Sequence, residues 1–210
     1  MADKEILIFV EGPSDKVFLE AYLYFLEDIP IKNFKVKDVT GKDNLSTKRL
    51  LEIEKYDKTL IIFDADKDYE SNKKEILKVV SKTKQTISEE QIFLFPNNQD
   101  DGDLETLLLE IAKYDEFLKC FEGYLECIKN KEHYKPIKNI RKNMLYAYLE
   151  VFGLENLTKT DGKDKIKEKH KEEYEKLKEV IDFNSKSLIP LKDFLGQFAE
   201  NKQKTKLKIF

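Results

Sequence analysis

Short apolar runs and amphipathic stretches alternate over the first half of the chain. Runs of branched and aromatic residues predict strands at residues 6–10, 34–39, 59–63 and 91–95. Between them, apolar residues recur at helical spacing and predict helices at residues 15–26, 45–54, 72–82 and 104–111. Strands that are apolar throughout and alternate with helices are typical of a parallel sheet covered on both faces. The pattern therefore predicts an α/β fold with a mainly parallel, four-stranded sheet.

Beyond about residue 114 the strand signal disappears and the pattern predicts only helices. These helices cover residues 115–129, 138–151, 163–180 and 191–200. We therefore expect two parts: an α/β core at residues 1–113, and a helical C-terminal region at residues 114–210 that packs on the core or extends it.

Polar residues directly follow three of the four predicted strands. Glu11 and Asp64 stand at the ends of the first and third strands, and a loop rich in Asn and Asp follows the fourth. Ligands of a parallel sheet bind outside the carboxyl ends of its strands, so these loops should line one pocket. The acids that would share this pocket are Glu11, Asp15, Asp64, Asp66, Asp103 and Glu105. Such closely packed carboxylates repel one another, and oxygen-only ligands favour Mg²⁺ or Mn²⁺ over Zn²⁺.

Helix capping is the simpler explanation for some polar residues of these loops. The residues that stand where a side chain can cap the following helix are Ser14, Asp15, Asp68 and Asp103. Capping accounts poorly for Glu11 and Asp64, which adjoin a strand end rather than a helix start. A shared metal site accounts for all of the acids together, so we favour it over capping alone.

Composition excludes several classes of protein. The 210 residues are enough for one sizeable core, and seven Gly and five Pro exclude a collagen-like or linker-like chain. No apolar stretch is long enough for a membrane span, and residues 1–5 do not resemble a secretory signal, so we expect a cytoplasmic protein. Cys120 and Cys127 are seven residues apart in a predicted helix, and we expect both thiols to be reduced and buried in the core.

Charge is divided unevenly along the chain. Residues 131–210 hold 19 basic and 13 acidic residues, a net charge of +6, whereas residues 1–130 hold 19 and 28, a net charge of −9. A general bias towards lysine would scatter positive charge without any function, and this explanation stays open. The alternative is that the basic region contacts the phosphates of a nucleic acid. The lysines that we expect to make these contacts are Lys138, Lys142, Lys163 and Lys165.

The order of the acidic motifs resembles a known domain. Glu11-Gly12 directly after a strand, then Asp15, and Asp64-x-Asp66 about fifty residues later look like the Toprim domain. This domain occurs in topoisomerases, primases, small ribonucleases and the overcoming-lysogenization-defect (OLD) nucleases, and the resemblance covers about the first 110 residues. Phosphatases of the haloacid dehalogenase type also carry Asp-x-Asp after a strand. In those enzymes the motif lies near the start of the chain and is followed by Gly-Thr or Thr, whereas Lys67-Asp68 follows it here. We therefore disfavour a phosphatase.

A second resemblance extends over nearly the whole chain. The segments at residues 95–98, 102–105 and 188–195 resemble a small stand-alone Toprim family labelled DUF3226, which is similar to OLD nucleases. The chain does not contain the Gly-x-x-x-x-Gly-Lys-Ser/Thr motif of the ATPase domain that OLD nucleases carry. We therefore expect any ATP-driven control to come from a separate protein.

The resemblance to OLD nucleases implies roles for individual residues. Those that match the first metal site are Glu11, Asp64 and Asp66, and those that match the second are Asp15, Asp103 and Glu105. Two metal ions about 4 Å apart can activate the attacking water and stabilise the leaving oxygen. OLD-like nucleases also place a lysine near the phosphate, and Lys142 matches that position. The implied catalytic residues are Glu11, Asp64, Asp66 and Lys142.

We therefore expect a nuclease that hydrolyses phosphodiester bonds with one or two Mg²⁺ or Mn²⁺ ions, and we favour DNA over RNA as its substrate. One alternative is a non-catalytic Toprim-fold module that binds nucleic acid or a protein partner, although such modules tend to lose the acids. Another is a nucleotidyl transferase or primase-like enzyme, which normally needs further catalytic or zinc domains. A homodimer also stays open.

Overall fold

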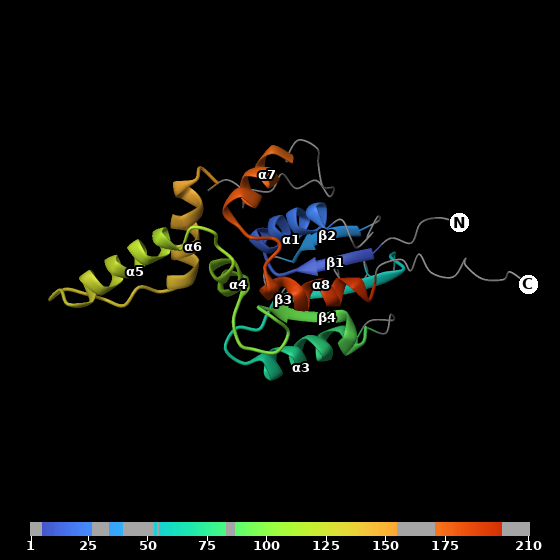
Figure 1. Cartoon of the computed structure of the whole chain (residues 1–210). Coiled ribbons are helices and arrows are strands. Elements are labelled where there is room, and N and C mark those ends of the chain that lie inside the picture. The colour runs from blue at the N-terminus through green and yellow to red at the C-terminus, as the bar shows by residue number, and fades with distance from the viewer. Residues whose placement is uncertain are drawn as a thin grey trace, which may run out of the picture.

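The centre of the molecule is a parallel sheet of four strands in the order β2-β1-β3-β4 (Figure 1). The strands are β1 (Ile6–Val10), β2 (Phe34–Asp38), β3 (Lys58–Asp64) and β4 (Ile92–Phe95). They come from a computed structural model that describes residues 6–26, 34–39, 53, 55–82, 87–154 and 171–198. The predicted four-stranded parallel sheet is confirmed.

The described part of the chain also contains seven α-helices. They are α1 (Pro13–Phe25), α3 (Tyr69–Val80), α4 (Leu104–Glu110), α5 (Asp115–Lys129), α6 (Ile140–Val151), α7 (Lys171–Val180) and α8 (Ile189–Gly196). The predicted helical C-terminal region is confirmed. The helix predicted at residues 45–54 and the first part of that predicted at residues 163–180 lie almost entirely outside the described residues. Within the described ranges, no helix has both the length and the apolar character to cross a membrane.

The strands β1, β3 and β4 are buried on both faces, which explains why they are apolar almost throughout, whereas only Val36 is buried on the edge strand β2. Successive side chains of a strand point to opposite faces. Ile8 and Ile62 belong to a core cluster shared with α1, α4, α6, α7 and α8. Leu7 and Ile61 belong to a second cluster, on the α3 side of the sheet.

The end of the described chain returns to the sheet. The rings of Phe194 on α8 and Phe93 on β4 lie 5.3 Å apart, and Leu191 and Leu195 of α8 are fully buried. In Figure 1, α8 lies between β1 and β4 and runs roughly along the direction of the strands. The helical C-terminal region therefore adds to the core of the α/β part, and the division at residue 113 stays a prediction.

The strand order determines where a ligand can bind. The chain passes from β1 to β2 on one side and then returns to place β3 on the other side of β1. At such a reversal the connections leave the two central strands in opposite directions and open a crevice at their carboxyl ends. Val10 of β1 pairs with Ile62 of β3, so the residues that follow the two strands emerge next to each other.

The expectation that both cysteines are buried is wrong. Cys120 and Cys127 are exposed on α5, of which only Leu125 is buried. Figure 1 shows that α5 projects away from the sheet beside α6. The seven-residue spacing does place the two thiols on one side of the helix, but that side faces solvent.

We predict that a buried hydroxyl stabilises the packing of α5, α6 and α7. Tyr148 donates a hydrogen bond to the Val180 carbonyl (2.7 Å) and accepts one from the Tyr114 amide (3.3 Å). Tyr148→Phe should lower the free energy of unfolding by about 1–2 kcal/mol in urea denaturation, because the Tyr114 amide loses its partner and the Val180 carbonyl keeps only the Lys113 amide. Tyr124→Phe is the matched control, because Tyr124 is 54% exposed, and should change it by less than about 0.5 kcal/mol. Equal losses in the two variants would contradict the prediction.

Candidate acidic site

The loops after β3 and β4 are joined to each other at the carboxyl edge of the sheet. The Ala65 amide donates to the Phe95 carbonyl (3.1 Å), and the Asp66 amide donates to the Gly102 carbonyl (2.7 Å). Gly102 has a φ of +147°, and a Cβ there would lie 2.9 Å from Cδ of Pro96. Only glycine fits this close approach without strain. The loop that leads to α4 is therefore held beside Asp64 and Asp66.

Asp64 is the last residue of β3, and its side chain contacts the start of α4. Its Oδ1 accepts a hydrogen bond from the amide of Leu104 (2.9 Å), one of the N-terminal amides of α4 that no residue within the helix can satisfy. Burial, together with the carboxylates of Asp15, Glu11 and Glu105, nevertheless raises the pKa of Asp64 to about 9. Desolvation and repulsion raise this pKa by more than the hydrogen bond from the Leu104 amide lowers it.

Asp15 lies on the first turn of α1 and faces the same carboxylates. Its Oδ2 accepts a hydrogen bond from the Gly12 amide (2.6 Å). Burial raises the pKa of Asp15 to about 7, the carboxylates of Glu105 and Glu11 add to the rise, and the Lys142 ammonium opposes it. Glu11, Asp15, Asp64 and Glu105 therefore interact as one group, which we call the acidic cluster.

A pocket of about 570 Å³ opens beside the acidic cluster. Its acidic lining consists of Asp64, Asp66, Asp103 and Glu105, and its basic lining of Lys67, Arg141 and Lys142. Arg141 and Lys142 belong to the first turn of α6. Further along α6, the Tyr146 hydroxyl shares a hydrogen bond with the Ser14 hydroxyl on α1 (3.3 Å). This contact ties α6 to the start of α1, next to Asp15.

Capping accounts for part of the predicted site. Asp103 is the N-cap of α4 and accepts hydrogen bonds from the Thr106 amide (2.8 Å) and hydroxyl (2.5 Å). It also forms an ion pair with Arg141 (3.1 Å). Partial burial opposes ionisation, but these bonds lower the pKa of Asp103. Asp68 likewise caps α3 through the Ser71 amide (2.9 Å).

The predicted lysines have different outcomes. Lys142 lines the pocket, and Lys138 is exposed just before α6. Lys163 and Lys165 lie outside the described residues. Sequence reasoning missed Arg141, although it is one of only two arginines in the chain and directly precedes Lys142.

The carboxylate oxygens of the acidic cluster are chemically suited to a hard cation. Asp64 and Asp15 each use one carboxylate oxygen for a backbone amide, and their other oxygens accept no hydrogen bond from the described residues. Carboxylate oxygens are the ligands that Mg²⁺ and Mn²⁺ prefer. In the described part of the chain, no three His, Cys, Asp or Glu side chains already form a metal-binding group. A cation held here would therefore require the carboxylates to turn towards one another.

The fold and the site together define an α/β protein with a carboxylate-rich pocket at the reversal point of a parallel sheet. A family model described as "Protein of unknown function (DUF3226)" matches residues 5–200, and the chain belongs to that family. The comparisons with curated proteins and with solved structures gave no match.

We predict that the buried Asp64 makes stability depend on pH. Folded Asp64 keeps its proton up to about pH 9, whereas an unfolded Asp releases it near pH 4. The folded state thus binds more protons between these values, and its stability falls as the pH rises through this range. Asp64→Asn cannot ionise, so without divalent cations it should be about 1–3 kcal/mol more stable than the wild type at pH 8 and similar to it at pH 5.

Urea denaturation at the two pH values measures this difference. Asp57→Asn is the matched control, because Asp57 is exposed and should change the unfolding free energy little at either pH. A destabilisation by Asp64→Asn at both values would show instead that the carboxylate holds the fold together.

Proposed function

We propose that this protein is a divalent-metal-dependent nuclease that hydrolyses phosphodiester bonds through a Toprim-like acidic site. The observation that carries the proposal is the acidic cluster, which lies beside a pocket whose basic lining includes Arg141 and Lys142. Carboxylates that repel one another favour a bound cation. The basic side chains offer contacts to a phosphate anion.

The strand order supports the Toprim relationship. Glu11 follows β1 and Asp64 ends β3, and these strands are neighbours at the centre of the sheet. The two motifs that define the resemblance therefore meet at one edge although they are about fifty residues apart. This arrangement suits a site in which both motifs hold the same ion.

The residues divide into ion-binding and phosphate-binding groups. Asp64 and Asp66, with Glu11, are assigned to a first ion, and Asp15 and Glu105 to a second. Bound Mg²⁺ or Mn²⁺ would supply an activated water and stabilise the leaving oxygen. Asp103 joins the second group only if it releases Arg141, with which it is paired.

Lys142 has the clearest support among the phosphate-binding residues. Its ammonium lines the pocket and is close enough to Asp15 to lower the pKa of that carboxyl group. A phosphate held at the acidic cluster would therefore lie within the reach of Lys142. Arg141 is positioned by Asp103, and its guanidinium can bind two oxygens of one phosphate.

Cleavage assays test the proposal directly. Supercoiled plasmid, single-stranded DNA and structured RNA are incubated with the protein in Mg²⁺, Mn²⁺ or chelator. We expect cleavage that needs metal and that falls by about 100-fold or more in Glu11→Gln and Asp64→Asn, while Asp57→Asn stays active. Cleavage in chelator, or full activity in Asp64→Asn, would contradict the assignment. Binding of nucleic acid with no cleavage and no effect of metal would instead favour a non-catalytic binding module.

We also predict that divalent cations stabilise the fold. A cation that binds the acidic cluster relieves repulsion in the folded state alone, so millimolar Mg²⁺ or Mn²⁺ should raise the melting temperature by several degrees. Asp64→Asn should lose most of this shift, and Asp57→Asn should keep it. An unchanged melting temperature of the wild-type protein would count against the metal site.

Binding to nucleic acid should depend on salt in a way that identifies the contacts. Each phosphate contact contributes nearly one to the slope of log affinity against log salt. We expect Lys142→Gln and Arg141→Gln each to reduce this slope by about 1, measured by fluorescence anisotropy with an oligonucleotide in chelator. Lys74→Gln, on the exposed side of α3, is the control and should leave the slope unchanged. Affinity that does not vary with salt would exclude the proposed contacts.

A further inference from the structure

The segment between α5 and α6 is exposed and basic. Residues 130–142, which comprise this segment and the start of α6, hold five basic side chains and one acid, Glu132. Of residues 130–139, which we call the basic connection, only Tyr134 and Ile137 are half-buried, and the others are exposed. Figure 1 shows the basic connection returning from the projecting end of α5 to the start of α6. Its positive charge therefore lies on the part of the molecule that projects from the sheet.

The basic connection ends at the acidic pocket. Ile137 and Asn139 line this pocket, and so do Arg141 and Lys142 at the start of α6. Asp64 of the acidic cluster lines the same pocket. A ligand that occupies the pocket and extends beyond it along this segment would therefore meet the other lysines one after another.

Hydrogen bonds to the backbone hold both ends of the basic connection. At the α5 end, the Lys131 amide donates to the Ile128 carbonyl (3.0 Å), and the Tyr134 amide donates to the Lys131 carbonyl (3.0 Å). At the α6 end, the side-chain amide of Asn143 donates to the Lys138 carbonyl (3.1 Å). The backbone at Lys131 and Lys138 is therefore tied to the two helices, which lowers the entropy cost of binding a partner there.

The lysines of the basic connection have no anionic partner in the described part of the chain. Lys131, Lys135 and Lys138 are exposed and form no ion pair with a described residue. Lys129, at the end of α5, is different because it pairs with Glu126 (2.5 Å). Three unpaired positive charges along one exposed segment are complementary to an anion with several negative charges.

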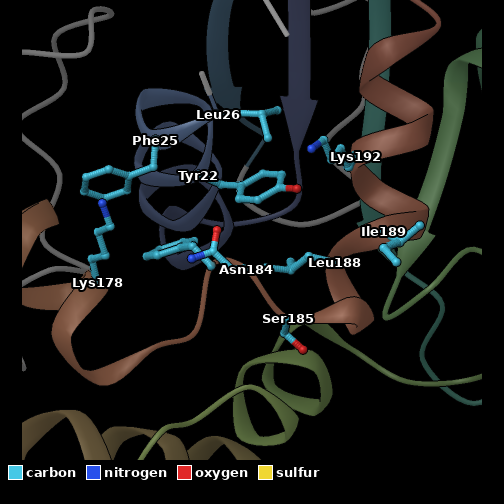
Figure 2. A pocket seen from close by; sticks show the side chains of 10 residues that line it. Tyr22, Phe25, Leu26, Lys178, Asn184, Ser185, Leu188, Ile189 and Lys192 are labelled. Atoms are coloured by element: carbon cyan, nitrogen blue, oxygen red, sulfur yellow. The ribbon is translucent and has the colours of Figure 1, made fainter. Parts of the chain in front are cut away.

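The lysines that line a second pocket are engaged within the chain. This second pocket, of about 360 Å³, lies between α1 and the connection from α7 to α8 (Figure 2). The Lys178 ammonium lies 4.6 Å from the centroid of the Phe25 ring, and Lys192 also has a partner within the chain. These contacts account for both lysines, whereas no contact of this kind accounts for those of the basic connection.

The chemistry of the basic connection favours a nucleic-acid backbone over a membrane. Pro136 is the one apolar residue among its exposed positions, so the segment offers almost no apolar surface to a lipid bilayer. A nucleic-acid backbone presents its phosphates in a row. The lysines of the basic connection likewise follow one another along one segment, and this segment leads away from a pocket with further basic groups.

We propose that the basic connection binds the backbone of a nucleic-acid strand whose reacting phosphate lies in the acidic pocket. Lys138 contacts a phosphate next to the pocket, and Lys135 and Lys131 contact phosphates farther along the strand. The substrate is therefore a polynucleotide rather than a mononucleotide or another small phosphate ester. This inference rests on the proposed function for the position of the reacting phosphate.

Fluorescence anisotropy on the full chain, in chelator, tests this surface with a labelled oligo(dT) of 16 nucleotides. The triple variant Lys131→Gln, Lys135→Gln and Lys138→Gln should bind this strand about tenfold or more weakly than the wild type. It should also reduce the slope of log affinity against log salt by about 2, because each phosphate contact of a single strand contributes about 0.7. An unchanged affinity and slope would overturn the proposal.

A matched triple variant controls for net charge. Lys74→Gln, Lys78→Gln and Lys82→Gln change three exposed lysines on or just after α3 and lower the net charge by the same amount. This control should bind the strand with the affinity and salt slope of the wild type. Equal losses in the two triple variants would overturn the proposal, because they would show an effect of net charge rather than of position.

Competition by strands of different length tests the expectation of a polynucleotide. A thymidine dinucleotide with a 5′-phosphate has too few phosphates to occupy the pocket and to contact three further lysines. It should displace the labelled strand only at a concentration about 100-fold or more above that of the unlabelled 16-nucleotide strand. A dinucleotide that competes as well as the longer strand would overturn the proposal.

The binding assays separate this proposal from the proposed function. Asp64→Asn should bind the 16-nucleotide strand at least as tightly as the wild type, although it should not cleave. Metal-dependent cleavage with unchanged binding in the Lys131 triple variant would overturn this proposal and leave the nuclease intact. Weaker binding in that variant, with no cleavage under any condition, would support the basic connection and contradict the nuclease. Binding of phosphatidylglycerol vesicles but not of the strand would assign the surface to a membrane and overturn the proposal.

Discussion

The pairing of β1 with β3 is the constraint on which the acidic site depends. It brings Glu11 and Asp64 to the same edge of the sheet, although α1 and β2 lie between them in the chain. The backbone of the β4–α4 loop then hydrogen-bonds to the residues after β3, so that α4 presents Glu105 to the same space. Acids from three separate loops are thus held at a distance at which they repel one another, and the folded sheet opposes their separation.

This repulsion connects stability with the proposed chemistry. A carboxyl group that stays protonated near neutral pH, as Asp64 does, is costly to ionise in the folded state. A cation would remove that cost and also neutralise an incoming phosphate. The basic groups at the start of α6 complement this arrangement, because Arg141 is already held by Asp103, which also lines the pocket. One helix from the C-terminal region therefore contributes to a site that is otherwise built by the α/β part.

Helix α1 connects the two pockets of the molecule. Its first turn carries Asp15, beside the acidic cluster, and its last turns carry Tyr22 and Phe25, which line the second pocket. The second pocket also needs residues between α7 and α8. The return of α8 to the sheet, through contacts such as Phe194 with Phe93, is what places those residues against α1.

The strands, most helices, the parallel sheet and the acids at the strand ends could be predicted from the sequence, because apolar runs, helical spacing and polar residues after strands are local patterns. Long-range packing decided the rest. The spacing of Cys120 and Cys127 indicates one side of a helix but not whether another element covers that side, and here it faces solvent. The ion pair between Asp103 and Arg141 depends on a contact between segments far apart in the chain. No local pattern records which distant groups meet, so only the tertiary structure could reveal the basic lining and the second pocket.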